Sequence, residues 1–96
     1  MIRRSVNKSI KQQIEELIKE LHLESEISFK VVKDIVWNEV EGNKEFQYLI
    51  GIFVKKAPNF ERANEVVQIV SEAWNTLPHK SLGGLSPVEM LQRNKN

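Results

Sequence analysis

The C-terminal third of the sequence carries the strongest constraint on the fold, because a helical pattern there must stop and restart within a few residues. Asn59 can cap a helix that begins after Pro58, and Glu61 complements the helix dipole in the first turn. Pro78 ends this helix, since proline disfavours a helical conformation in the residue before it. The apolar residues expected on its core face are Phe60, Ala63, Val67, Val70 and Trp74.

A second helix start follows at Ser86-Pro87-Val88-Glu89. Serine at the N-cap, proline at the first position and glutamate at the third form a nearly complete start signal. Between the two helices, Gly83 and Gly84 can adopt the positive φ that a reversal needs. We therefore predict a structured loop followed by a short last helix that starts at Ser86.

The remaining residues of this segment are predicted to hold the loop in place. Asn75 can cap the end of the long helix, and His79 can hydrogen-bond local backbone. We expect the following apolar residues to fix the loop and the last helix on the core: Trp74, Leu77, Leu82, Leu85, Met90 and Leu91.

The N-terminal helix has an equally clear start. Ser9 and Gln12 have the spacing of a capping box. The apolar residues that follow at helical spacing are Ile10, Ile14, Leu17, Ile18 and Leu21.

The middle of the chain, residues 28–56, has two interpretations. As a helix, residues 28–41 place Phe29, Val32, Ile35, Val36 and Val40 on one face. Gly42 would then stop this helix in a left-handed conformation, and Asn43 would cap another. The core stripe of that next helix would be Phe46, Leu49, Ile50 and Phe53.

The alternative is a β-hairpin that turns at Gly42-Asn43. It would pair Trp37 with Tyr48 and is consistent with the many β-branched and aromatic residues nearby. The adjacent pairs Val31-Val32 and Lys33-Asp34 break the alternation of a strand but not the helical pattern. We therefore predict an all-α bundle of about five helices, with an α+β fold as the alternative.

Length and composition indicate one small globular domain, residues 1–96. The chain is 41% hydrophobic and 28% charged, far from the composition of disordered proteins. It has no cysteine, which is consistent with a reducing compartment, and no apolar run long enough to span a bilayer. We expect a cytoplasmic protein without a membrane partner.

The segment from Trp74-Asn75 through Pro78-His79-Lys80-Ser81-Leu82-Gly83-Gly84-Leu85-Ser86-Pro87-Val88-Glu89 resembles the tail of integrase-core transposases. Similar tails also occur in small uncharacterised prokaryotic proteins. The resemblance covers about a fifth of the chain and implies a shared helix-loop-helix end or a shared binding surface. It does not extend to the catalytic core, whose sheet and three separated carboxylates have no counterpart here, so no catalytic residue is carried over.

Other chemistry has little support in the sequence. Its only histidines, His22 and His79, have no metal-ligand spacing, and no phosphate loop or nucleophile elbow is present. We predict a protein that is not an enzyme, with no cofactor and no metal.

Two functions remain. The first is a helical protein-interaction module that binds itself or another protein, with the candidate surface in the segment Trp74–Glu89. The second is a nucleic-acid-binding accessory of a mobile genetic element. It would use the N-terminal cations Arg3, Arg4, Lys8 and Lys11, with His79-Lys80 as a further candidate contact. The net charge of only +1 favours the first.

Overall fold

The computed structural model describes residues 8–94, which form five α-helices and one short 3₁₀ helix and contain no β-strand. The α-helices are α1 (Ile10–Glu20), α2 (Phe29–Trp37), α3 (Asn43–Val54), α4 (Phe60–Thr76) and α5 (Pro87–Asn94), and the 3₁₀ helix η1 (Lys80–Leu82) precedes α5. The predicted all-α fold is confirmed. The alternative hairpin is wrong, because Gly42-Asn43 joins two helices.

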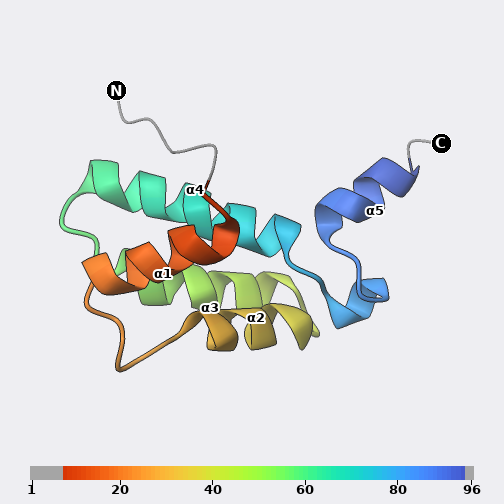
Figure 1. The fold of residues 1–96 in the computed structure, drawn as a ribbon, viewed down its shortest axis with the longest axis horizontal. Coiled ribbons are helices and arrows are strands. Elements are labelled where there is room, and N and C mark those ends of the chain that lie inside the picture. The colour runs from red at the N-terminus through yellow and green to blue at the C-terminus, as the bar shows by residue number, and fades with distance from the viewer. Residues whose placement is uncertain (1–7, 95–96) are drawn as a thin grey trace.

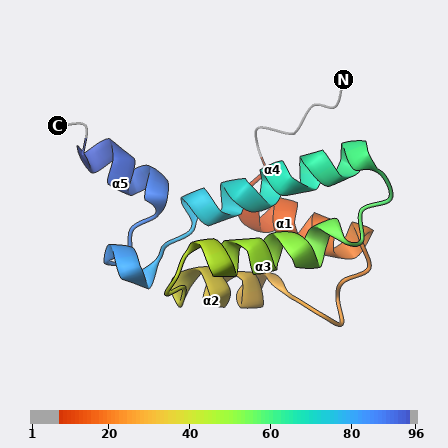
Figure 2. The same ribbon diagram turned by 180° about the vertical axis from the view of Figure 1, so that it is seen from behind.

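Four helices form a body, and the fifth lies at one end of it (Figures 1 and 2). α4 packs against α1 and α3, and α2 packs against α3 and α1. α5 lies beyond the C-terminal end of α4, which is its main helical neighbour. The buried apolar core of the described residues comes from the body and ends at the residue after α4: Ile14, Leu17, Ile18, Leu21, Leu23, Ile27, Val32, Val36, Leu49, Phe53, Val66, Ile69, Val70, Ala73 and Leu77.

Three helices of the body begin at side-chain caps. The Ser9 hydroxyl accepts from the Gln12 amide at 3.1 Å and the Gln12 side chain accepts from the Ser9 amide, so the predicted capping box is confirmed. Asn59 accepts from the backbone of the third helical residue at 2.8 Å, as predicted for α4. Ser28 caps α2 in the same way, at 3.3 Å. These contacts satisfy amides that have no partner inside the helix.

α1 ends in a left-handed turn that contains no glycine. His22 has a φ of 57°. The Leu23 amide donates to the Ile18 carbonyl at 2.8 Å and the His22 amide donates to the Lys19 carbonyl at 3.2 Å, which is the bonding pattern of a Schellman motif. Leu23 and Ile18 are both buried, and their burial holds a conformation that L-residues with a side chain rarely adopt.

The connection between α2 and α3 corrects four sequence predictions. α2 ends at Trp37 and not near Glu41, because Asn38 caps it with side-chain and backbone bonds to the Asp34 carbonyl. Val40 therefore leaves the predicted core face and is 84% exposed. Gly42 does adopt a positive φ, but it precedes α3 as its N-cap, so it does not end α2, and Asn43 is the first residue of α3 and not its cap.

The core face of α4 is rotated from the predicted one. Val66, Val70 and Ala73 are buried, whereas Phe60 is 79% exposed. Six residues at 100° each place Phe60 about 120° around the helix axis from Val66, and so outside the buried face. Phe60 was therefore wrongly assigned to the core.

Arg62 joins α4 to α1 at the surface. Its Nε atom donates to Glu20 at 2.8 Å and its Nη1 atom donates to Glu65 at 2.7 Å. The hydrogen bond from Arg62 lowers the pKa of Glu20, and the two carboxylates raise the pKa of Arg62. This cluster fixes the end of α1 against the start of α4.

Candidate functional site

The loop after α4 is organised around His79, which is only 2% exposed. The His79 Nε2 atom lies 2.8 Å from the Trp74 carbonyl oxygen in the last turns of α4. Because a carbonyl only accepts, Nε2 carries the proton and donates it. The two rings also meet edge to face, with centroids 4.9 Å apart and planes at 79°. The predicted bond from His79 to local backbone is confirmed.

Glu39 connects this loop to the body. It lies between α2 and α3, and its side chain is 9% exposed. Its Oε1 atom accepts a hydrogen bond from the Ser81 hydroxyl and lies 3.5 Å from His79 Nδ1. A carboxylate from a distant part of the chain thus meets both a hydroxyl and an imidazole of the loop. We call the contacts of Glu39, Ser81, His79 and Trp74 the clasp.

Sequence reasoning did not find Glu39. No local motif distinguishes it from the other glutamates, and only the path of the chain between α2 and α3 brings it to the loop.

The order of contacts in the clasp differs from that of a serine–histidine nucleophile. Such a site needs the hydroxyl to donate to the imidazole that acts as its base. Here the Ser81 hydroxyl donates to the Glu39 carboxylate and not to His79. The His79 Nε2 atom is hydrogen-bonded to the backbone carbonyl of Trp74. The arrangement holds a loop against a helix bundle.

The loop backbone closes on itself around the same histidine. The His79 amide donates to the Leu85 carbonyl at 3.0 Å, and the Gly84 amide donates to the His79 carbonyl at 2.9 Å. Gly83 and Gly84 have φ values of 70° and 89°, which confirms the predicted positive-φ reversal. A methyl group placed on Gly84 would lie 3.9 Å from the Trp37 ring, so the loop also rests against the end of α2.

Trp74 joins these contacts to α3. Its ring centroid lies 5.3 Å from that of Phe46, with the planes at 60°. Trp74 therefore contacts both the body and the loop, as predicted for a residue that fixes the loop.

α5 begins at the predicted capping box. The Glu89 amide donates to the Ser86 hydroxyl at 3.1 Å, and the Glu89 carboxylate accepts from the Ser86 amide at 2.8 Å. Ser86 is 3% exposed, and Pro87 is the first helical residue. The last helix is thus positioned by its loop and its cap.

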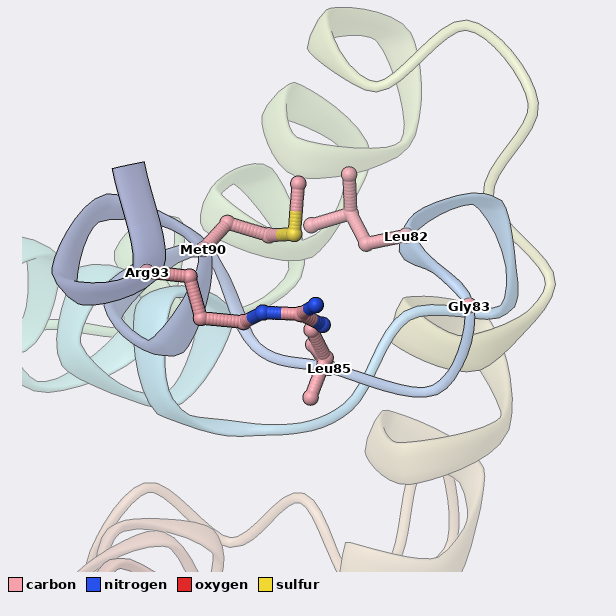
Figure 3. Close-up of a pocket in the computed structure, with 5 residues that line it drawn as sticks. All are labelled: Leu82, Gly83, Leu85, Met90 and Arg93. Atoms are coloured by element: carbon pink, nitrogen blue, oxygen red, sulfur yellow. The ribbon is translucent and has the colours of Figure 1, made fainter. Parts of the chain in front are cut away.

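Beyond the cap, α5 and the loop enclose an open hollow of about 490 Å³ (Figure 3). Met90 and Leu82 point toward each other across it, and in this view the Arg93 guanidinium ends beside Leu85. Leu91 is 66% exposed and Val88 38% exposed. The predicted return of Met90 and Leu91 to the core is wrong: Met90 lines the hollow, Leu91 is exposed, and the buried apolar residues end at Leu77.

Three residues of the candidate motif lie outside the clasp, the glycine turn, the cap of α5 and the hollow. Asn75, Pro78 and Lys80 are exposed. Asn75 was predicted as a cap, but α4 continues through it to Thr76, so that assignment is wrong. Pro78 follows the extended residue Leu77, where α4 ends as predicted.

The predicted N-terminal basic cluster is described only in part, because Arg3 and Arg4 lie outside residues 8–94. Lys8 is paired with Glu16 at 2.6 Å. Lys11 reaches a second hollow of about 440 Å³ between α1 and the start of α2. The lining residues of that hollow are Lys11, Glu15, Ser28, Phe29, Lys30 and Lys33. Three cations therefore share it with one carboxylate, and Lys30 also lies 3.5 Å from Asp34.

No helix within residues 8–94 has both the length and the apolar content needed to cross a membrane. In the same range, no three histidine or acidic side chains gather as a metal site would require. Comparison of the chain with protein-family models, curated proteins and solved structures finds no match.

Proposed function

We propose that this chain is a non-enzymatic protein-interaction module whose partner binds at the C-terminal arm, which we define as residues 79–94. One observation carries the proposal: residues of the loop and the cap at the base of the arm are buried, but several apolar side chains of the arm are only partly covered. His79 and Ser86 are buried in the loop and the cap, whereas Leu82, Leu85 and Met90 line an open hollow.

Without a partner, this arrangement leaves apolar surface in contact with water, which is unfavourable in free energy. An isolated helix as short as α5 is marginal in water, and its usual stabilisation comes from burying an apolar face. None of the α5 side chains at positions 87–93 is fully buried. Apolar side chains gathered at the surface of a small protein are typical of an interaction site, because a partner that buries them lowers the free energy.

The nucleic-acid alternative has weaker support. Lys11, Lys30 and Lys33 do share one hollow, but Glu15 lines it too, and Lys8 is paired with Glu16. Phosphate binding needs cations that are not neutralised by their own chain. We therefore expect no binding of a random DNA duplex at physiological salt. A tight complex that weakens steeply with salt would reverse this ranking.

The proposal can be tested by selecting binders from a displayed library of random peptides against the immobilised protein. We expect selected peptides to lose binding to Met90→Glu, which places a charge in the hollow. They should still bind Phe60→Glu, a matched control that replaces an exposed apolar residue at the other end of α4. Sedimentation equilibrium of the free protein tests whether a second copy is the partner.

Peptides that bind both variants equally would place the interaction elsewhere. A selection that yields no binder, together with a monomer at all concentrations, would refute the interaction function. We also propose a cytoplasmic location, which a chain without cysteine permits.

A further inference from the structure

The hollow of the C-terminal arm carries a charge as well as an apolar surface. Of its lining residues, Leu82, Leu85 and Met90 are apolar and Arg93 is the only one with a charge. Methionine adapts its shape to different apolar partners, and Met90 lies opposite Leu82 (Figure 3). The site therefore offers an adaptable apolar contact beside a single guanidinium.

The positive charge of the arm is not neutralised within the described chain. The charged residues of the arm are Lys80, Glu89 and Arg93. Glu89 accepts from the Ser86 amide in the capping box, and neither Lys80 nor Arg93 forms an ion pair with any residue in 8–94. By contrast, several cations of the body do pair with carboxylates of their own chain: Lys8, Lys30, Lys44, Lys55 and Arg62.

A guanidinium next to leucine side chains is well placed to bind a carboxylate. Its planar fork donates two parallel hydrogen bonds, and the apolar neighbours exclude part of the competing water. The volume of about 490 Å³ lies within the range of roughly 300–1,000 Å³ that binding pockets span. A peptide that places apolar side chains at i and i+3 or i+4 beside an acidic residue complements both features.

We propose that the hollow binds an acidic amphipathic segment of a partner protein. Apolar side chains of the segment occupy the space between Leu82, Leu85 and Met90, and a carboxylate of the segment pairs with Arg93. This inference rests on the proposed function, and it adds the chemistry of the partner.

The test uses three synthetic amphipathic peptides of about four helical turns. They share the same leucine positions and carry glutamate, glutamine or lysine at the flanking positions. Fluorescence anisotropy measures the binding of each labelled peptide to the full chain. We expect the glutamate peptide to bind about fivefold more tightly than the glutamine peptide, as for one partly exposed ion pair, and the lysine peptide to bind most weakly.

Three variants test whether the difference in affinity between the glutamate and glutamine peptides comes from Arg93. In Arg93→Gln the preference for glutamate over glutamine should disappear, while the glutamine peptide binds as before. Arg93→Lys keeps the charge and loses the fork, so it should retain part of the preference. Lys56→Gln, which removes an exposed cation from the other end of the body, serves as the control and should retain all of it.

The other outcomes are decisive against the inference. Equal affinity for the three peptides, or a preference that persists in Arg93→Gln, would overturn the acidic chemistry and leave the interaction function standing. If none of the three peptides binds, an acidic amphipathic segment is not the partner. The interaction function itself is decided separately, by the random-library selection. Self-association through the same hollow would identify the partner as a second copy and also overturn it.

Discussion

Replacing His79 by alanine should release the arm without unfolding the body. The variant loses the 2.8 Å bond from Nε2 and leaves the Trp74 carbonyl without its donor, which costs about 1–3 kcal/mol. It also loses the edge-to-face contact with the Trp74 ring, worth about 0.5–1.5 kcal/mol. The sum, about 1.5–4.5 kcal/mol, should destabilise the loop and not the body, because the buried apolar core of the described residues ends at Leu77.

Amide hydrogen exchange measures this release residue by residue. The Gly84 and Leu85 amides, which hydrogen-bond within the loop, should exchange about 10- to 2,000-fold faster in His79→Ala than in the natural protein. The amides of α1 and α4 should keep their protection. Lys80→Ala is the matched control, since Lys80 is exposed in the same loop and makes no ion pair in residues 8–94.

Two results would refute this reasoning. Unchanged exchange at Gly84 and Leu85 would mean that the clasp contributes nothing to the position of the loop. Loss of protection throughout α1 and α4 would mean that the arm and the body unfold as one unit.

Three further changes test separate parts of the structure. Ser86→Ala removes the capping box and should cost about 0.5–2 kcal/mol, measured as faster exchange of the α5 amides; unchanged exchange would mean that the helix does not depend on its cap. His22→Gly relieves the left-handed conformation at the end of α1 and should raise the free energy of unfolding by about 1 kcal/mol; a lower midpoint in urea would contradict the Schellman assignment. The pKa of Glu20 is lowered in the folded state, so its bond with Arg62 stabilises the protein at pH values above the unfolded pKa. This contribution is lost as the pH falls through the folded pKa. In Glu20→Gln that part of the acid dependence of stability should be absent from urea titrations between about pH 5 and pH 2.

Local signals in the sequence were sufficient to predict three of the helix starts. Ser9, Asn59 and Ser86 each act on amides within the next three residues, so their spacing alone specifies the contact. The choice of helices over a hairpin near Gly42 likewise depended on a periodicity that the adjacent pair Val31-Val32 preserves only in a helix.

Features that depend on distant residues were not predictable. Val40, Phe60 and Leu91 are apolar at helical spacing but exposed. Val40 follows the end of α2, Phe60 lies outside the buried face of α4, and Leu91 lies on a helix beyond the core. Glu39 reaches His79 because two loops far apart in the sequence come together. The left-handed residue His22 was missed because the usual signal for such a turn, glycine, is not there.

In the proposed function, the clasp holds the arm so that its open apolar hollow faces a protein partner. Methyl-resolved NMR of the full chain, titrated with a peptide selected from the random library, tests it most directly. We expect saturable shifts of the Leu82, Leu85 and Met90 methyl groups, while the Val66 and Val70 methyl groups inside the body stay unchanged. Shifts that fall on body methyl groups and leave these three unmoved would contradict it.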